Sequence, residues 1–167
     1  MIDYLTLKQK DSVTINGKMA KRIMKDVTNA MDEYVSLTFV REDGTIWYID
    51  PYKNEMEFKQ RKPSNVGTNN DHPFLVLPVE KTEEGKYVYK GVYVAKLVAE
   101  YFMPEYPWPE CKYKRYRLGR KDGDNMNCRL DNLYWRDEAE IEQIYLKRGE
   151  QMTRGRQYVA SVKQQAS

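Results

Sequence analysis

Residues 122–135 read DGDNMNCRLDNLYW, and this stretch decides the fold that we expect. Its first ten residues, Asp122–Asp131, are polar and carry the Asp-Gly and Asn signals of a loop. Asn132–Trp135 predicts a short strand, and Tyr113–Gly119, upstream of the loop, predicts another. The sequence around the loop therefore predicts two strands joined by a long polar connection.

A helix is expected directly after this stretch. Asp137 is a candidate N-cap, Glu138 and Glu140 follow in the first turn, and Lys147-Arg148-Gly149 lies at the far end. This is the order of charges that the helix dipole favours, and glycine is the usual residue just past a helix. Beyond Gly149 the chain is polar and weakly basic, which predicts a flexible tail over residues 150–167.

Toward the N-terminus, hydrophobic patterning predicts two hairpins. The paired strands cover residues 34–40 with 45–50, across an Asp43-Gly44 turn, and residues 74–80 with 86–94, across Glu83-Glu84-Gly85. The second hairpin is predicted to continue into a helix over residues 95–102, which stops before Met103-Pro104. The polar segment 53–71 predicts a long loop.

The first residues predict short strands followed by a helix. Residues 4–7 and 12–15 are β-like, and Asn16-Gly17 is a turn dipeptide. From Lys18 to about Met31, apolar residues recur at helical spacing, which predicts an amphipathic helix. The start of the chain has no apolar stretch of the kind found in signal peptides, and we expect no export by that route and no membrane partner.

Composition excludes several classes of site. One histidine cannot supply a multi-histidine zinc site or a two-histidine iron site, and Cys111 and Cys128 do not have zinc-site spacing. The formal net charge of +3 does not settle the partner. The chain has 14 Tyr and three Trp against four Phe. This excess of amphipathic aromatic residues is typical of partly solvated interfaces, and it is equally typical of strand-rich structure.

Two segments carry a resemblance to a known family. Residues 97–102, LVAEYF, resemble the "HRLVAEAF" helix of phage-type HNH homing endonucleases of the His-Me finger family. Residues 122–135 are similar, without a gap, to that family's "DGNKLNNRVENLEW" loop. The resemblance spans about residues 74–146, and the hairpin of residues 34–51 resembles a strand module often found upstream. It implies that the matching residues hold the loop together: Asp122, Gly123, Asn127, Arg129, Asn132, Leu133 and Trp135.

The positions that carry the family's chemistry have changed. The resemblance places the general-base histidine at Arg120, the adjacent metal ligand at Gly119, the helix asparagine at Ile141 and an earlier histidine at Ala95. Arginine stays protonated and cannot accept a proton from water, and its charge opposes metal binding. We therefore predict no catalytic residue, no metal ligand, no cofactor and no enzymatic activity. His72 is interpreted as an ordinary exposed or hydrogen-bonded side chain, not a substitute base.

A basic run precedes the loop and is a candidate binding surface for nucleic acid or an acidic partner. Basic residues interleaved with tyrosines suit phosphate contacts and base stacking, whereas the alternative is a charged edge strand or a protein interface. In a strand, Tyr113, Arg115 and Arg117 would share one face. The candidate residues are Lys112, Lys114, Arg115, Arg117, Arg120 and Lys121.

The expected fold is α+β, with an upstream β-hairpin module, a β-hairpin–helix, a ββα HNH-like core and two terminal arms. The expected divisions are residues 1–33, 34–71, 72–149 and 150–167. The resemblance implies a pseudoenzyme serving as a structural or adaptor subunit of a tailed-phage virion, in a ring, collar or connector assembled in the bacterial cytoplasm. Its partners would be other protein subunits in a homo-oligomeric ring. The alternative is a catalytically dead DNA-binding protein, either a regulator or an anti-defence factor.

Overall fold

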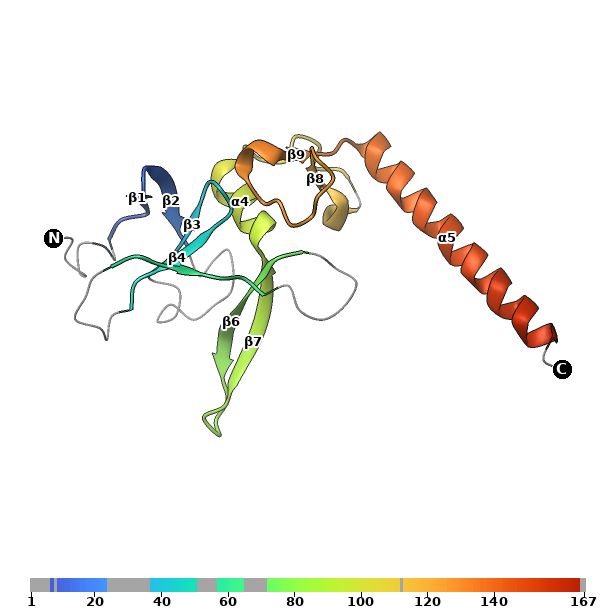
Figure 1. Ribbon diagram of the computed structural model, residues 1–167, viewed down its shortest axis with the longest axis horizontal. Helices are drawn as coiled ribbons and strands as arrows, with labels where there is room; N and C mark the ends of the chain where they lie inside the picture. The colour runs from blue at the N-terminus through green and yellow to red at the C-terminus, as the bar shows by residue number, and fades with distance from the viewer. Residues whose placement is uncertain are drawn as a thin grey trace. The chain divides into compact units, whose positions relative to one another are not determined.

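The computed structural model describes Leu7 and residues 9–23, 37–50, 57–64, 72–111 and 113–165 of the 167-residue chain. Strands and helices are mixed along these ranges, as the sequence predicts (Figure 1). Contacts between Cα atoms divide the chain into two compact units. The first unit comprises Met1–Glu105 and Arg120–Tyr134, and the second comprises Tyr106–Gly119 and Trp135–Ser167. The predicted four-part division stays a prediction.

The first unit contains a five-stranded antiparallel sheet whose strands are neighbours in sequence order. Its strands are β1 (Ser12–Ile15), β2 (Lys18–Arg22), β3 (Thr38–Arg41), β4 (Ile46–Tyr48) and β5 (Lys59–Arg61). Phe39 and Trp47 of the sheet pack with Leu7, which precedes β1, in a buried hydrophobic cluster. Short turns join β1 to β2 and β3 to β4, where the paired strands follow each other directly along the chain.

The prediction of a helix starting at Lys18 is wrong. Lys18–Arg22 forms β2 and pairs with β1, so that Ile15 lies opposite Lys18. Asn16 and Gly17 have φ values of 47° and 77°, the positive values that a two-residue hairpin turn requires. The turn therefore returns the chain as a second strand, a consequence of the Asn-Gly dipeptide that outweighs helical spacing further on. Residues 4–6 and 24–36 lie outside the described residues.

Both predicted hairpins are confirmed, whereas the loop over residues 53–71 is only partly right. β3 and β4 pair across residues 42–45. Lys59–Arg61 is a strand that pairs with β4, and Ser64 forms an isolated bridge with Phe74. Lys59 and Arg61 are partly buried in this border strand, and Arg61 Nη2 donates to the Val76 carbonyl at 3.1 Å, so polar residues here form a strand that polarity alone did not predict. Residues 51–56 and 65–71 lie outside the described residues.

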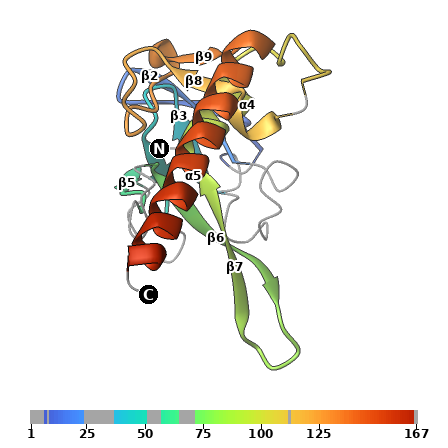
Figure 2. The same ribbon diagram turned by 90° about the vertical axis from the view of Figure 1, so that its right-hand side faces the viewer.

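The second hairpin consists of β6 (Phe74–Lys81) and β7 (Tyr87–Tyr93), with an irregularity between Pro78 and Glu80 (Figure 2). It leads directly into α4 (Val94–Phe102), as predicted. Helix α4 buries Val94, Ala95, Leu97, Val98 and Ala99 and packs against β3 and β7. The helix ends at Met103 in extended backbone, because Pro104 disfavours the helical conformation of the residue before it.

A close contact fixes the β3–β4 turn against the loop that follows β8. Gly44 has a φ of 80°, and a Cβ atom built there would lie 2.8 Å from the Cys128 carbonyl oxygen. The Leu130 amide donates a hydrogen bond to the Glu42 carbonyl at 2.9 Å. Only a glycine allows both the turn and this approach, so the Asp43-Gly44 dipeptide sets where the loop lies in the first unit.

Short elements flank this loop. They are the 3-10 helix η1 (Lys114–Tyr116), the strand β8 (Leu118–Arg120), the 3-10 helix η2 (Leu130–Asn132) and the strand β9 (Leu133–Trp135), with β8 and β9 forming a two-stranded sheet. The strand predicted at Asn132–Trp135 is confirmed. The strand predicted over Tyr113–Gly119 is wrong before Leu118, because residues 114–116 form η1. The shared faces expected of a continuous strand therefore do not exist.

The second unit is built around η1 and the first turns of α5 (Glu138–Gln165). Tyr116 is 7% exposed and Ile141 is 0% exposed, and they pack with Cys111 in a small hydrophobic cluster. Burial of the Tyr116 ring is the physical reason that this segment turns instead of extending. The predicted N-cap is confirmed, because the Glu140 amide donates to the Asp137 carboxylate at 2.9 Å.

The predicted end of the last helix at Gly149 is wrong. Helix α5 continues to Gln165, and Gly149 does not adopt the positive φ of a helix C-cap. Glycine weakens a helix without necessarily ending it, so the charge order at residues 147–149 was misleading. No helix in the described part of the chain combines the length and apolarity that crossing a bilayer demands.

Gly44 and Gly85 provide a matched test of the close contact. Both have φ near 80°, but a Cβ atom at Gly85 would meet nothing within 4 Å. We expect Gly85→Ala to lower the free energy of unfolding by about 1–2 kcal/mol through backbone strain alone. Gly44→Ala should lower it by about 1–3 kcal/mol more, because of overpacking against Cys128. Urea denaturation measures both, and equal losses would contradict the contact.

Candidate functional site

Asp122 is the centre of the loop between β8 and β9. Its carboxylate accepts hydrogen bonds from the Asp124 amide at 2.9 Å, from Asn127 Nδ2 at 2.8 Å and from Asn132 Nδ2 at 2.9 Å. Gly123 follows with a φ of 74°, which lets the chain turn sharply after Asp122. One carboxylate thus joins the beginning, middle and end of the loop.

Asn132 closes the loop from its other end. This side chain is 7% exposed, its Oδ1 accepts from the Asp122 amide at 3.1 Å, and its Nδ2 also donates to the Asn127 carbonyl at 3.0 Å. The Lys121 amide donates to the Asn132 carbonyl at 2.8 Å. A buried amide needs such partners, and this one joins the two flanks of the loop.

The remaining residues predicted to hold the loop lie at its surface or beyond it. The Arg129 amide donates to Asn127 Oδ1 at 3.3 Å, and its exposed guanidinium contacts the Asp131 carboxylate at 3.2 Å. Trp135 belongs to the second unit, where its ring packs edge-on against Tyr106 at 5.4 Å between centroids. Asp122, Asn127 and Asn132 are therefore the residues that close the loop directly.

The hydrogen bonds lower the pKa of Asp122 from its ordinary value. The largest cause is the bond from Asn127, followed by those from the Asp124 amide and Asn132. A carboxyl whose pKa is lower in the folded state stabilises the fold above its unfolded pKa, near 4, and loses that contribution as pH falls.

Acid should therefore weaken the loop through Asp122. We expect the difference in unfolding free energy between the wild type and Asp122→Asn to be largest at neutral pH and to shrink as pH falls below about 4. Denaturation at several pH values measures the difference, and NMR titration of the Asp122 carboxyl carbon locates its pKa. A difference that does not change with pH, or an ordinary pKa, would contradict the network.

Arg120, Cys128 and the beginning of α4 meet beside the loop. Cys128 is buried and unbridged, and burial raises the pKa of its thiol. The Arg120 guanidinium and the backbone amide of Ala95 act on the same thiol in the opposite direction without outweighing burial. Arg120 is half-buried, and its Nε is buried without a hydrogen-bond partner among the described residues. The positions that the resemblance assigns to two histidines thus converge on one thiol.

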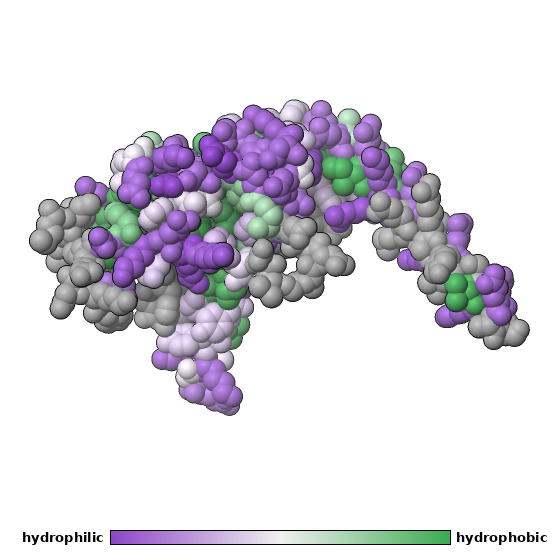
Figure 3. All heavy atoms as spheres, viewed as in Figure 1, coloured by the Kyte–Doolittle hydropathy of each residue, from purple (hydrophilic) through white to green (hydrophobic). Residues whose placement is uncertain are grey.

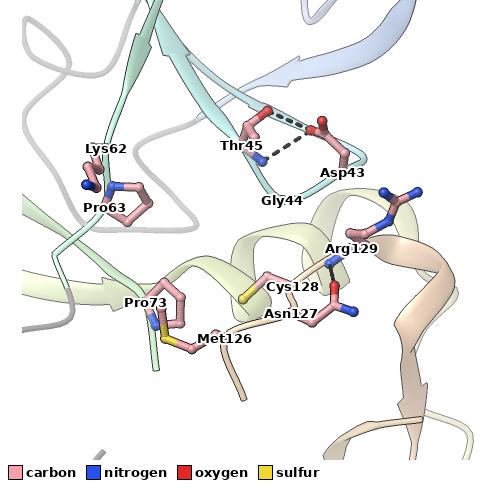
Figure 4. A pocket seen from close by; sticks show the side chains of 10 residues that line it. All are labelled: Asp43, Gly44, Thr45, Lys62, Pro63, Pro73, Met126, Asn127, Cys128 and Arg129. Carbon is pink, nitrogen blue, oxygen red and sulfur yellow. Dashed lines mark hydrogen bonds between the residues drawn. The ribbon is translucent and has the colours of Figure 1, made fainter. Parts of the chain in front are cut away.

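A cavity of about 280 Å³ lies next to Cys128, between the β3–β4 turn and residues 126–129. Figure 4 shows Lys62 and Pro63 on one wall and Asn127 and Arg129 on the other. The remaining lining residues are Asp43, Gly44, Thr45, Pro73, Met126 and Cys128. The cavity is too small for an extended ligand and has cationic groups at two sides.

Asp43 is the strongest ionic centre near this cavity, and the sequence analysis did not single it out. Its carboxylate accepts hydrogen bonds from Arg41 Nε at 2.9 Å and from the Thr45 hydroxyl at 2.6 Å. Burial raises the pKa of Asp43, but the bonds from Arg41 and Thr45 outweigh it and hold the pKa well below its usual range. Asp43 therefore stays ionised, and Arg41 compensates its negative charge within the turn. The sequence signal that could have identified Asp43 is an Asp-Gly turn flanked by Arg41 and Thr45.

The described members of the basic run differ in their exposure. Lys114 is exposed on η1, Lys121 is exposed at the start of the loop, and Arg120 is half-buried beside Cys128. Lys112 lies outside the described residues, and only the backbone of Arg115 is described. The chain also turns at η1, so these residues do not lie along one strand. A binding surface formed by the basic run stays a prediction.

Arg117 has a structural role within the second unit. Its Nη2 donates to the carbonyls of Pro109 at 3.1 Å and Cys111 at 2.7 Å, and its guanidinium lies 4.1 Å from the centre of the Tyr106 ring. Its Nε is buried. The planar group thereby joins Pro109 and Cys111 to the end of η1, with Nη2 bonded to both of their carbonyls.

Lysine should not replace Arg117, because an ammonium lacks the planar fork that reaches both carbonyls and the ring. We expect Arg117→Lys to lower the free energy of unfolding by about 1–3 kcal/mol. Lys114→Arg is the matched control on the same segment and should leave stability unchanged, since Lys114 is exposed. Thermal denaturation measures both, and a neutral Arg117→Lys would contradict this role.

Three further positions are linked to catalysis: two are buried, and the third, His72, packs against a tyrosine of β7. Gly119 is buried, and Ile141 is 0% exposed in the cluster of the second unit. The His72 ring packs against Tyr93 at 5.6 Å between centroids, at the base of the β6–β7 hairpin. Within the described ranges, no group of three or more His, Cys, Asp or Glu side chains is arranged to hold a metal ion.

Comparison with protein-family models, with curated proteins and with solved structures gave no match for this chain. Its function must therefore be inferred from its own residues and their arrangement.

Proposed function

We propose that this chain is a non-catalytic structural or adaptor subunit of a tailed-phage virion, built on an HNH-type endonuclease fold that has lost its active site. The observation that carries the proposal is Arg120, a cation where a general base would be needed. It lies half-buried beside a thiol whose pKa is raised. A permanently protonated side chain cannot activate water, and its charge repels a divalent cation.

The order of elements supports an HNH-like core. Helix α4 follows the β6–β7 hairpin, and β8, the Asp122 loop, β9 and α5 follow in turn. Ala95 and Arg120 are far apart in sequence but act on the same Cys128 thiol. This convergence is what the resemblance requires of the two positions where related nucleases carry histidines. Loop closure by Asp122, Asn127 and Asn132 without catalytic side chains supports a retained scaffold.

Loss of the other chemical groups supports the non-catalytic part of the proposal. Gly119 has no side chain, and Ile141 is an apolar side chain with 0% exposure. Neither residue has a side-chain oxygen to coordinate a metal. Ile141 instead packs with Tyr116 and Cys111, so the position now contributes to stability.

Exposed aromatic side chains support a subunit role. Tyr89 is 60% exposed, Tyr93 48% and Trp108 44%. Large aromatic groups with a polar end are favoured at the centre of protein interfaces. The chain would assemble with other protein subunits, including copies of itself, in the bacterial cytoplasm and remain in the particle.

The second candidate, a DNA-binding protein without cleavage activity, is favoured by the exposed side chains of Lys114 and Lys121 in the basic run. Against it, Arg117 directs its donors to Pro109 and Cys111. A DNA-binding surface would need the residues whose side chains are not described, Lys112 and Arg115, to complete it.

Particle composition tests the proposal. We expect the chain in virions purified from the bacteria that produce it, at a fixed copy number by quantitative mass spectrometry. The purified protein should not nick supercoiled plasmid in Mg²⁺ or Mn²⁺. Magnesium-dependent nicking, or absence from the particle, would contradict it.

Salt dependence separates the two candidates. A DNA-binding protein should lose duplex affinity steeply as salt rises, and Lys114→Ala with Lys121→Ala should reduce that slope by about 2. A structural subunit should show weak duplex binding that these changes do not affect. Steep, lysine-dependent binding combined with absence from particles would favour the second candidate.

A further inference from the structure

Helix α5 is longer than its own unit needs. Ile141, Ile144 and Arg148 pack it onto the second unit, the last with its guanidinium 5.0 Å from the Tyr116 ring centre. Beyond Arg148, every side chain that the structure describes is exposed: Glu150, Arg156, Gln157, Val162, Lys163, Gln164 and Gln165. In Figure 3, α5 is mostly hydrophilic, with hydrophobic residues at the surface near both ends. The described side chains of this segment contribute little buried surface, and most of the stability of a helix in a protein comes from packing of an apolar face.

Gly149 gives a second sign that the helix has a partner. Glycine inside a helix costs about 1 kcal/mol relative to alanine. A Cβ atom at Gly149 would meet no described atom within 4 Å beyond the nearby backbone of its own helix, and the backbone there is helical. The space beside this position in the described part of one copy therefore does not require glycine. Close approach of another backbone would require it.

Gly149 lies on an exposed stripe that runs the length of the helix. The spacing between its described members is four, three, four, seven and seven residues, a repeat that keeps them on one face of a helix that winds around another. Tyr145 is 46% exposed although its ring stacks on Tyr113, and the charged members are exposed as well. The members are Glu138, Glu142, Tyr145, Gly149, Arg156 and Lys163.

Charge is divided between the two halves of this helix. Residues 137–146 carry four acidic side chains and no basic one, whereas residues 147–163 carry five basic side chains and one acidic one. The formal charges are therefore −4 and +4. Two such helices attract each other only when they run in opposite directions, because parallel pairing would place acid against acid and base against base.

We propose that two copies of this chain pair through antiparallel α5 helices along this stripe. When Glu138 of one copy lies opposite Lys163 of the second, the centre of the pair falls between residues 150 and 151, beside Gly149. The same register places Tyr145 opposite Arg156, a cation–π pairing. This register thus pairs one acidic with one basic member of the stripe, pairs the aromatic residue with a cation, and brings the two glycines near the point where the helices cross.

The pairing is isologous, because each copy supplies the same stripe to the other. It gives the predicted C-terminal arm a partner: the acidic half of α5 in a second copy. This inference deepens the proposed function and rests on the chain acting as a homo-oligomeric subunit. The pair would be the repeating element from which a larger assembly is built.

Charge reversal in the full-length chain tests the pairing. Sedimentation equilibrium should show a wild-type dimer that weakens as salt rises. Glu138→Lys with Glu142→Lys makes the charged members of the stripe basic at both ends, and Arg156→Glu with Lys163→Glu makes them acidic at both ends. Each double variant should dimerise at least tenfold more weakly than the wild type, since like charges face each other. An equimolar mixture of the two double variants should form a heterodimer.

The variant with all four reversals establishes direction. It should dimerise with itself but not with the wild type, because antiparallel pairing with the wild type places like charges together. Gly149→Leu should also weaken the dimer at least tenfold while leaving the monomer folded by circular dichroism. The charge-matched control is Glu83→Lys with Glu84→Lys in the exposed turn between β6 and β7, which should leave dimerisation unchanged.

Several results would overturn the pairing. These are a wild-type chain that stays monomeric at millimolar concentration, a dimer that none of the α5 variants weakens, and a four-reversal variant that pairs with the wild type. If the chain is found in virions but its association is unaffected by these variants, the pairing is contradicted and the proposed function is not. If the dimer behaves as expected but the chain is absent from virions, the proposed function is contradicted and the pairing is not.

Discussion

The close approach of Gly44 to the backbone of Cys128 is the constraint on which the first unit depends. A distance of 2.8 Å from a Cβ atom at Gly44 to the Cys128 carbonyl leaves no room for any side chain. The hydrogen bond from Leu130 to Glu42 lies beside it and adds a polar link. The loop between β8 and β9 is closed by its own hydrogen bonds, and the β3–β4 turn, together with the start of α4, fixes its position in the first unit.

The same arrangement determines the chemistry near the loop. Holding Cys128 against the turn also buries its thiol, close to Arg120 and the start of α4. Burial keeps the Cys128 thiol protonated, so it does not act as a base. The positive charge of Arg120 beside the thiol repels a divalent cation. Asp122 uses its carboxylate to accept three hydrogen bonds from the loop itself. The acidic group most suited to a metal is thereby engaged in stabilising the backbone.

Sequence patterns predicted elements whose signals are local. Glu83-Glu84-Gly85, the β-branched strands and the Asp137 cap specify structure through residues next to each other, and each was found. Patterns failed where a distant partner decided the outcome. Tyr116 turns its segment because its ring is buried with Ile141, and Lys59–Arg61 is a strand because β4 offers a free edge. At the candidate site, the sequence predicted the loop residues but missed Asp43, whose importance depends on partners gathered by the turn.

The sequence by itself determined which side-chain groups stand at the positions that the resemblance links to catalysis. It has a single histidine, arginine at the expected base position, and no side-chain oxygen at residues 119 and 141. Side-chain identity settles these points, since protonation and coordination depend first on atom type. Only the tertiary structure decided that Ala95, Arg120 and Cys128 meet and that Arg117 binds the carbonyls of Pro109 and Cys111, because these contacts join residues that are not neighbours in the chain. It also decided that α5 extends past Gly149, since a glycine in the sequence does not by itself say whether a helix ends.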